Sequence, residues 1–473
     1  MSLLRAAPVS PSAAAMTRLR VRRDTLPRAD GAAPAAADKR EPVDTDTEDD
    51  DHDVGLDEGG LEGGARRRGR TGGFESIFWK SSDYISPERK AVSGERKRVT
   101  MASSSSSSSP IGVAIIGGGL FVKEQHLPAV LACRSLALRA IYSRSLKSAE
   151  STAALIPGLV AAAAAEAGQT QQQQPHVDLY SEDSDPGRAL VDVLSRDDIS
   201  AVIIALPILA QPAVVEAALA AGKHVLAEKP IAKDVPAAKA LIASYHAQRA
   251  ATSGRCTLSI AENFRFIPRF AYAAEAAARM GRVTHFSVKV MSHMRPDNKY
   301  YQTAWRQEPG YQGGFLLDGG VHHAAAARLF LRGEANRAAT VRAATDLVQP
   351  GLPPIDTVAA VVRTAGGATG TFLHSAGTLM EAFEWDVACE GGWVRSAGET
   401  VTVKPKDGEK TERVFERTSG VKDEVAAWAN GIARGEPNPL QSPEEALADL
   451  EFLEKMFVSG ERDGELGRYE LQL

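Results

Sequence analysis

Two adjacent histidines, His322 and His323, open the alanine-rich apolar segment GGFLLDGGVHHAAAARLFL at residues 313–331. A histidine can take up or release a proton near neutral pH, although at the start of an apolar helix it is more often a hydrogen-bonded core residue. Adjacent residues of a helix point about 100° apart, whereas residues four apart share a face. The spacing therefore predicts that Asp318 and His322, rather than the two histidines, lie together.

A lysine, Lys229, follows a short apolar run in HVLAEKPIAKD, residues 224–234. The run predicts a buried strand, and open α/β sheets bind ligands beyond the carboxyl ends of their strands. A lysine held there and partly removed from water could hydrogen-bond a substrate hydroxyl or lower the pKa of the group that does. Because a lone lysine after a strand is usually a surface residue, the combination of motifs carries the argument.

Three consecutive glycines, Gly117, Gly118 and Gly119, end a predicted strand in VAIIGGGLFV. Glycines between a strand and a helix permit a tight turn, and a pyrophosphate can then rest on the free N–H groups at the start of the helix. The usual fingerprint has a further glycine or alanine where this chain has Val122. The position of the turn on the first strand nevertheless predicts nucleotide binding.

The end of the second predicted strand carries Ser143 and Arg144. A domain that binds NAD usually has Asp or Glu there for the ribose 2'-hydroxyl, whereas a guanidinium beside a hydroxyl suits a 2'-phosphate. We therefore expect NADP to be preferred, with NAD as the alternative. The competing interpretation of Arg144 is an exposed arginine at a strand end.

Short apolar runs alternate with amphipathic segments from Ile111 onward. Such alternation predicts a doubly wound parallel sheet of the Rossmann type, with helices on both faces. A low-complexity insert at 157–176 is expected to lengthen one surface connection, and the first domain is expected to span 110–262. The predicted strands are 111–116, 136–143, 177–180, 200–207 and 223–228, and the predicted helices are 122–133, 145–156, 185–195 (with Asp185 as cap) and 211–222.

Residues 263–473 have a different rhythm, in which segments of alternating hydrophobicity are separated by glycine turns. This pattern predicts an α+β domain with an open, mainly antiparallel sheet that has one exposed face. Ser442 and Glu445 have the spacing of a capping box at the start of a last helix. The predicted strands are 283–294, 356–366, 368–377, 385–398 and 400–405, and the predicted helices are 267–281, 422–435 and 442–457.

The composition is that of a globular protein, since 44% of the 473 residues are hydrophobic and 24% are charged. A net charge of -5 provides no basic excess for nucleic acid. The three cysteines are far apart and lack CxxC spacing, which favours a reducing compartment and no metal site. The longest apolar stretch, 199–222, is interrupted by Pro207 and Pro212 and predicts strand, turn and helix rather than a membrane span.

Residues 1–109 show no sustained hydrophobic periodicity and contain acidic, basic and serine-rich runs. Such a segment cannot bury enough apolar surface to offset its ordering entropy, so we predict a disordered extension. A start at Met101 is one hypothesis for its origin. A mitochondrial transit peptide or a nuclear signal would be the alternatives to the cytoplasmic location that we expect.

Together, the glycine turn, AGKHVLAEKPIAKD and GGFLLDGGVHH resemble the Gfo/Idh/MocA oxidoreductases, here in a eukaryotic, fungal-type form with an N-terminal extension. The resemblance covers residues 111–473. It implies a dinucleotide-binding domain and a second domain whose open sheet flanks the substrate and often forms contacts in a homo-oligomer. It also implies hydride transfer to or from a carbinol carbon of a sugar, polyol or cyclitol.

Carried over residue by residue, the resemblance assigns catalytic roles to three residues. Lys229 matches the lysine of E-K-P, near nicotinamide and substrate, while Asp318 and His322 match D-x-G-x-H. His322 would accept the hydroxyl proton while Lys229 and Asp318 orient the substrate. The expected cofactor-binding residues are Gly117, Gly118, Gly119, Leu120, Phe121, Ser143, Arg144, Leu206, Pro207, Glu228 and Lys229. The expected substrate contacts are Arg265, Tyr301, Trp305 and Arg306, and for Arg265 the alternative is that it braces the domain junction.

The chain departs from the family pattern at Val122, at Ala325, and in LPILAQP, which lacks the usual Asn and His after the fourth strand. Familiar sugar specificity is therefore not implied. A catalytically idle, dinucleotide-binding regulator of the same family is the alternative, and the presence of Lys229, Asp318 and His322 favours the enzyme. A metal-dependent hydrolase is a third interpretation, and it is disfavoured because the chain has no HxH or HExxH spacing.

Overall fold

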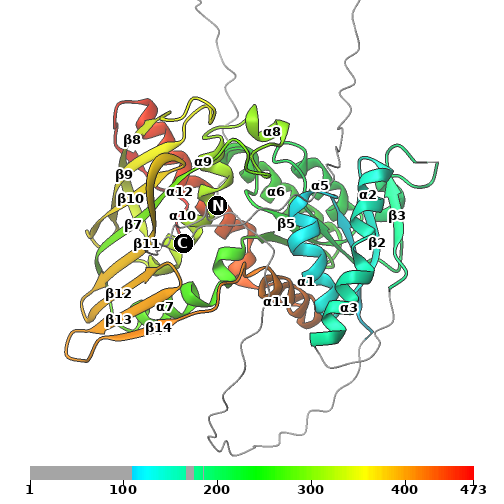
Figure 1. Ribbon diagram of the computed structural model, residues 1–473, viewed down its shortest axis with the longest axis horizontal. Helices are drawn as coiled ribbons and strands as arrows, with labels where there is room; N and C mark the ends of the chain where they lie inside the picture. The colour runs from blue at the N-terminus through cyan, green and yellow to red at the C-terminus, as the bar shows by residue number, and fades with distance from the viewer. Residues whose placement is uncertain (1–108, 167–174, 185) are drawn as a thin grey trace, which may run out of the picture. The chain divides into compact units, whose positions relative to one another are not determined.

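The computed structural model describes residues 109–166, 175–184 and 186–473 (Figure 1). The predictions for the N-terminal extension and for the glutamine-rich end of the insert lie outside these residues. The predicted helix 185–195 begins only at Leu190 with Ala189 as its N-cap, so the prediction of Asp185 as its cap is wrong.

The first sheet has six parallel strands in the order β3-β2-β1-β4-β5-β6. The order reverses between β1 and β4, the point at which such sheets bind ligands. The predicted Rossmann-type doubly wound fold is therefore confirmed. The strands are β1 (Ile111–Ile116), β2 (Leu136–Ser143), β3 (Asp178–Ser181), β4 (Ala201–Ile204), β5 (His224–Glu228) and β6 (Leu258–Ala261).

Apolar side chains of this sheet alternate between two cores, because successive residues of a strand point to opposite faces. Val113 and Ile115 of β1 belong to one core, and Ala114 and Ile116 belong to the other. The helices of this part of the chain are η1 (Val122–His126), α1 (Leu127–Ala132), α2 (Leu146–Ala153), α3 (Ile156–Glu166), α4 (Leu190–Leu194), α5 (Gln211–Ala220) and α6 (Val235–Ala251).

The first half of the predicted insert forms helix α3 within the connection between β2 and β3, and this helix was not predicted. Alanine is the best helix former, and α3 also buries Val160 and Ala164. These two effects explain why an alanine run becomes part of the fold.

The stretch Leu146–Ala165, which contains α2 and most of α3, is the one candidate membrane span among the described residues by length and hydropathy. A turn at 154–155 divides it, and α2 contacts β2 and β3 of the first sheet. A single such helix is weak evidence for a membrane, because helices of water-soluble proteins pass the same test.

The second sheet has nine strands in the order β14-β13-β12-β11-β7-β10-β9-β8-β15. Only β7 and β10 pair in parallel; the other pairs are antiparallel, which confirms the predicted α+β domain. β8, β14, β15 and the first half of β11 were not predicted, and a turn at 390–391 divides the predicted strand 385–398 into the end of β11 and β12. The strands are β7 (Val283–His293), β8 (Ala338–Asp346), β9 (Thr357–Thr364), β10 (Thr369–Ser375), β11 (Gly377–Cys389), β12 (Gly392–Ala397), β13 (Thr400–Pro405), β14 (Thr411–Val414) and β15 (Gly467–Arg468).

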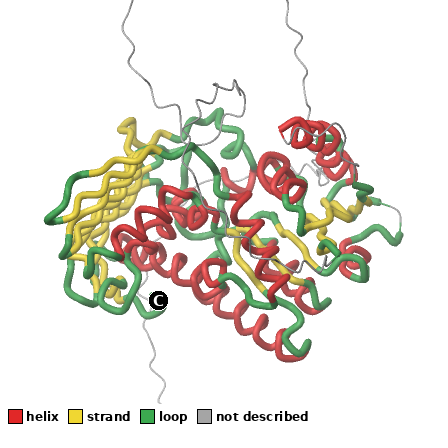
Figure 2. The backbone as a smooth tube through the Cα atoms, turned by 90° about the horizontal axis from the view of Figure 1, so that it is seen from below, coloured by secondary structure: helices red, strands yellow, loops and turns green. Residues whose placement is uncertain are grey.

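Helices cover one side of this sheet (Figure 2). Residues of β9 alternate between buried and exposed along its length, as expected for a sheet with one solvent face. Assembly of a homo-oligomer through that face stays a prediction. The remaining helices are η2 (Asn263–Phe266), α7 (Pro268–Ala278), α8 (Ala304–Gln307), α9 (Phe315–Asp318), α10 (Gly320–Phe330), α11 (Val421–Arg434), η3 (Pro439–Gln441) and α12 (Pro443–Glu461).

Helix α11 joins the core of the first sheet, although it lies far along the chain from it. Val421, Val425 and Trp428 pack with residues of β1 and α1, and α11 runs beside α1 (Figure 1). The predicted first domain, residues 110–262, therefore leaves out a helix that packs in the core of the first sheet.

Candidate active site

The glycine turn after β1 has the shape of a phosphate cradle. Gly117 has φ +126°, and a Cβ there would lie 2.3 Å from the Ala205 carbonyl oxygen. A Cβ on Gly118 would lie 2.4 Å from Ser148 Oγ, whereas one on Gly119 would meet nothing within 4 Å. The turn thus needs glycine, leaves Gly119 open, and leads into the free N–H groups of a helix start, which fits a dinucleotide pyrophosphate.

Val122, the departure from the glycine fingerprint, is the first residue of the π-helix η1. Its side chain is buried in the core that contains Val113 and Ile115 of β1. A π-helix adds a residue to the turn and is frequent at functional sites. The valine is accommodated in the core behind the glycine turn.

The end of β2 places Ser143 and Arg144 near this turn. Ser143 is buried, and its Oγ would lie 3.1 Å from a Cβ on Gly118. Arg144 is exposed, and the next residue, Ser145, caps α2 through its hydroxyl, which accepts from the N–H of Ser148. An exposed guanidinium beside the cradle suits a 2'-phosphate.

Lys229 and Arg306 form an ion cluster around the buried Asp318. Lys229 Nζ donates to the carbonyl oxygen of Asp318 at 2.9 Å and to its Oδ1 at 3.0 Å, while Arg306 Nε donates to Oδ2 at 2.7 Å. Burial alone would raise the pKa of Asp318, but Arg306 and Lys229 outweigh it and hold that pKa well below its usual range. Asp318 is therefore a permanent anion that orients Lys229, and it is unsuited to carry a proton.

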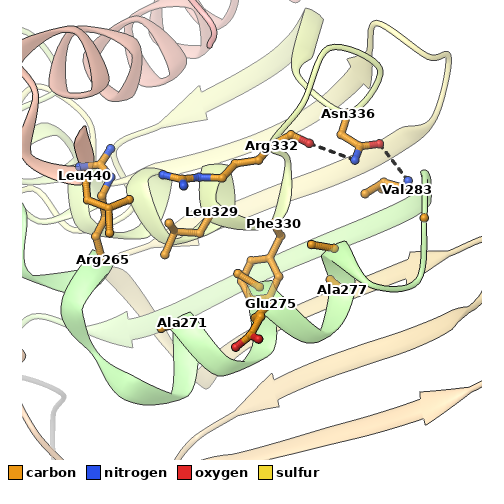
Figure 3. Close-up of a pocket in the computed structure, with 13 residues that line it drawn as sticks. Arg265, Ala271, Glu275, Ala277, Val283, Leu329, Phe330, Arg332, Asn336 and Leu440 are labelled. Carbon is orange, nitrogen blue, oxygen red and sulfur yellow. Dashed lines mark hydrogen bonds between the residues drawn. The ribbon is translucent and has the colours of Figure 1, made fainter. Parts of the chain in front are cut away.

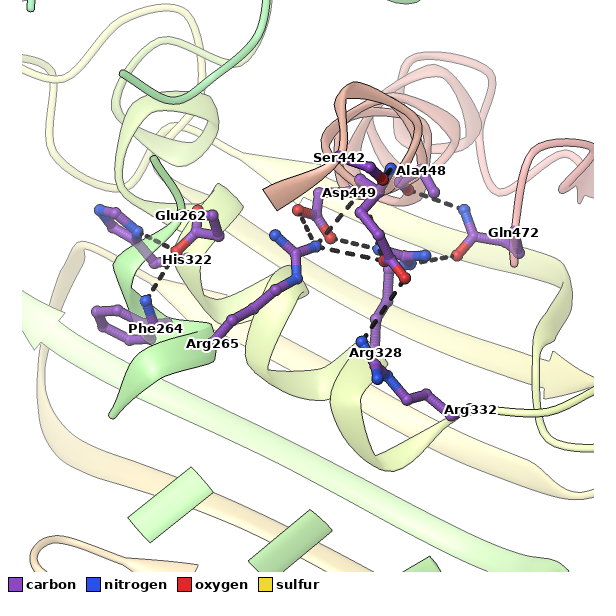
Figure 4. Close-up of polar contacts among 11 residues, drawn as sticks. Glu262, Phe264, Arg265, His322, Arg328, Arg332, Ser442, Ala448, Asp449 and Gln472 are labelled. Atoms are coloured by element: carbon purple, nitrogen blue, oxygen red, sulfur yellow. Dashed lines mark hydrogen bonds and ion pairs between the residues drawn. The ribbon is translucent and has the colours of Figure 1, made fainter. Parts of the chain in front are cut away.

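His322 is held by a residue that the sequence did not single out. Its Nδ1 lies 2.7 Å from Glu262 Oε1, and the ring of Phe264 stacks on the imidazole with centroids 4.7 Å apart (Figure 4). Asp318 ends α9 and His322 is in the first turn of α10, with Gly319 between them in a helical conformation. The two predicted partners thus lie at adjoining helix ends, where each contacts a different residue from the first sheet's carboxyl edge.

His323 points into the second domain's core. Its ring meets His374 edge-on at 4.5 Å and also contacts Phe383 and Trp385. Burial, followed by the nearby His374, His322 and Lys229, lowers the pKa of His323 well below its usual value. His323 is a neutral core residue, in line with the helix geometry that separated it from His322.

Glu228 braces the end of β5. Its Oε1 lies 2.6 Å from Nε2 of the buried His126 in η1, and its Oε2 accepts from the N–H of Lys229 at 3.2 Å. Gln211 donates to its carbonyl oxygen at 2.5 Å. Glu228 therefore fixes the backbone at Lys229, and His126 is a further site residue that the sequence analysis missed.

Leu206 and Pro207 follow β4 at the same edge of the sheet, while Leu120 and Phe121 begin the helix after the glycine turn. Leu120 is exposed, and Phe121 meets the ring of His126 edge-on at 5.3 Å. The predicted cofactor-binding residues therefore come from the carboxyl ends of β1, β2, β4 and β5.

The loop before α9 was expected to contact substrate, and three of its residues have partners within the protein. The Tyr301 hydroxyl donates to the carbonyl oxygen of Gly351, and the Arg306 guanidinium lies 4.0 Å from the Trp305 ring centroid. Tyr300, which was not predicted, donates to Glu124 Oε2 of η1 at 2.6 Å. These contacts tie the loop to both domains, and Arg306 acts through Asp318.

Arg265 does not face this cluster, so the prediction that it contacts the substrate is corrected here. It is 3% exposed, and its Nη2 donates to Asp449 Oδ2 of α12 at 2.5 Å (Figure 4). Arg328 Nη1 donates to Asp449 Oδ1 at 2.6 Å. A guanidinium engaged in such a buried network braces η2 against α10 and α12.

A separate cavity of about 310 Å³ lies between α7 and α10 (Figure 3). Its walls are mainly alanines of α7 together with Leu329, Phe330 and Leu440. Of the residues predicted to bind substrate or cofactor, Arg265 alone lines it.

Comparison with known proteins identifies both domains. Residues 111–253 match the model of the oxidoreductase family with an NAD-binding Rossmann fold, and residues 270–395 match the GFO/IDH/MocA C-terminal domain. Dehydrogenase FPY6 of Fusarium mangiferae is 37% identical over 364 residues, which cover 75% of this chain and 98% of that protein.

Two solved structures have the same fold. An oxidoreductase from Thermotoga maritima superposes with a TM-score of 0.63 at 27% identity, covering 77% of this chain and 100% of that one. KijD10, a 3-ketoreductase from Actinomadura kijaniata in complex with NADP and TDP-benzene, has a TM-score of 0.57 at 22% identity, covering 74% and 98%.

Proposed function

Because the chain belongs to the GFO/IDH/MocA oxidoreductase family, we propose that it transfers hydride between a nicotinamide cofactor and a carbinol or carbonyl carbon of a small sugar-like compound. The ion cluster of Lys229, Asp318 and Arg306, together with His322, carries this proposal, since Lys229 provides an orienting cation and His322 a proton acceptor. The alternative is a regulator that binds dinucleotide without turnover.

The roles of the chain's residues follow from their contacts. Lys229 donates two of its ammonium hydrogens to Asp318, which leaves one for a substrate oxygen. His322 has an imidazole that can accept or donate a proton, and it exchanges a proton with that oxygen. A bound nicotinamide dinucleotide supplies the hydride donor or acceptor, and the glycine turn holds its pyrophosphate.

The test combines cofactor binding with turnover. Purified protein is titrated with NADPH and NADH, and sugars, inositols and diols are then screened by nicotinamide absorbance. We expect His322→Asn to lower kcat by about 10²- to 10⁴-fold with cofactor affinity unchanged, because a general base is lost. His176→Gln, an exposed histidine, is the matched control. Binding without turnover of any compound, together with unchanged behaviour of the His322 variant, would favour the regulator.

We further propose that NADP is preferred over NAD. Arg144 is exposed beside the cradle, and no acidic residue occupies the two positions at the end of β2. Arg144→Asp should weaken NADPH binding by about 10-fold or more while leaving NADH binding within about 3-fold, since a charge-assisted pair to the 2'-phosphate is worth about 1.5–3 kcal/mol. Arg134→Asp, on a surface turn, is the control, and unchanged NADPH affinity in Arg144→Asp would exclude the assignment.

A further inference from the structure

Glu262 lies between the two domains and makes its side-chain contacts through one oxygen. It follows β6 directly and caps η2, where its Oε1 accepts from the N–H of Phe264 at 3.2 Å. The same oxygen lies 2.7 Å from His322 Nδ1, and the Glu262 side chain is 1% exposed. Its Oε2 is buried and has no hydrogen-bond partner within residues 109–166, 175–184 and 186–473.

The charge of Glu262 decides which partner holds the proton. Burial alone would raise the pKa of Glu262, but His322, Arg265 and Lys229 outweigh it and lower that pKa. An ionised carboxylate can only accept hydrogen bonds, so Nδ1 of His322 must be the donor. A neutral imidazole with its hydrogen on Nδ1 has its lone pair on Nε2.

The ring is also fixed in orientation. Phe264, two residues after Glu262, stacks on His322 with an interplanar angle of 14°. The neighbouring His323 and His374 have no carboxylate at Nδ1, and both atoms are buried without a partner in the described part of the chain. The contact with Glu262 therefore distinguishes His322 from the two histidines that pack behind it.

We propose that Glu262 is a positioning residue that keeps the hydrogen of His322 on Nδ1 and so leaves Nε2 as the atom that exchanges a proton with the substrate. This inference rests on the proposed function. In the oxidation direction the substrate O–H bond breaks and an Nε2–H bond forms. The C–H bond of the same carbon breaks as hydride passes to the nicotinamide acceptor of the proposed function, and the electron pair left on oxygen forms the C=O bond. Glu262 then faces the imidazolium and stabilises it, and the proton returns in the reverse direction.

The first arm of the test reads the tautomer without reference to activity. Native protein is labelled with ¹⁵N-histidine, and the His322 ring signals are assigned by their loss in His322→Asn. We expect a protonated Nδ1 and an unprotonated Nε2. In Glu262→Gln we expect a shift of the hydrogen toward Nε2, because an amide can donate to Nδ1 as well as accept from it.

The second arm measures turnover with the compound found in the screen. Glu262→Gln should lower kcat by about 100-fold with KM within about 3-fold, as for loss of much of a general base. Glu262→Asp keeps the charge and should recover at least about 10-fold of that loss. Glu275→Gln, an exposed carboxylate on α7, is the matched control and should leave both arms unchanged.

The proposal is overturned if native His322 carries its hydrogen on Nε2, a result that needs no variant to fold. It is also overturned if Glu262→Gln folds and leaves both the tautomer and kcat unchanged. If Glu262 sets the tautomer but native protein turns over none of the screened compounds, the proposed function fails while the tautomer assignment stands.

Discussion

Each of the two side chains that can donate or accept a proton in the site is held by its own carboxylate. Asp318 holds Lys229, and Glu262 holds His322, each at hydrogen-bond distance. Both carboxylates are buried and ionised, so neither competes for the proton that the reaction moves. At this scale each anion fixes one side chain: Asp318 fixes the ammonium of Lys229, and Glu262 fixes Nδ1 of His322.

Buried histidines behind the site predict a loss of stability in acid. Burial lowers the pKa of His374 to about 3 from 6.5. Above pH 6.5 both folded and unfolded His374 are neutral and its stability contribution is fully present; as the pH falls from 6.5 toward 3, only the unfolded chain takes up the proton. This residue should therefore lower the free energy of unfolding by about 2 kcal/mol between pH 7 and pH 5.

The measurement is urea unfolding of native protein and His374→Gln at both pH values. The variant is expected to show a pH dependence smaller by that amount, whatever its stability at pH 7. His176→Gln, at an exposed position, should keep the native pH dependence. Equal pH dependence in His374→Gln and native protein would show that folding does not lower the pKa of His374.

At the scale of elements, one ion network holds the short helix η2 against α10 and α12. Asp449 of α12 accepts from Arg265 of η2 and from Arg328 of α10, and Arg328 also pairs with Glu445 at 2.8 Å. Glu262 caps η2, and His322 is on α10. The network thus holds together the two elements whose approach brings Glu262 to His322.

Removing the central carboxylate should destabilise the fold strongly. Asp449→Asn leaves two buried guanidinium groups with a lost charge partner, which costs about 3–5 kcal/mol of unfolding free energy. Asp386→Asn breaks the exposed pair with Arg395 and should cost at most about 1 kcal/mol. Urea unfolding at pH 7 compares the two, and equal costs would mean that the buried network contributes no more than a surface pair.

At the scale of the whole described molecule, the two sheets depend on each other through helices that cross between them. Helix α11 follows the last long strands of the second sheet, yet its apolar face completes the first sheet's core. Tyr300 and Lys299, from the loop after β7, both contact Glu124 of η1. The cofactor cradle and the substrate side are therefore joined on two sides of the site.

Trp428 tests the contribution of α11. It is 2% exposed in the first core, and Trp428→Ala should lower the free energy of unfolding by about 3–5 kcal/mol, because a large cavity is left. Val191→Ala, at a residue 68% exposed, should change it by less than about 0.5 kcal/mol. A cost for Trp428→Ala as small as that of the control would mean that α11 does not stabilise the first sheet.

The sequence alone determined what depends on neighbours along the chain. Strand and helix alternation, the glycine turn and the motifs at Lys229, Asp318 and His322 are local patterns, and from them the fold class and the family followed. The separation of His322 from His323 was also available, because it depends only on the helical repeat.

The tertiary structure alone decided the partners, because contacts between distant segments leave no spacing in the sequence. Glu262 and His322 are 60 residues apart, and Lys229 and Asp318 are 89 apart. Arg265 donates to Asp449, which is 184 residues away along the chain. The position of Arg265 in the sequence, three residues after Glu262, therefore could not show that its side chain faces away from Lys229 and Asp318. Burial, which sets the charge of Glu262 and Asp318 and the neutrality of His374, likewise exists only once the sheets have packed.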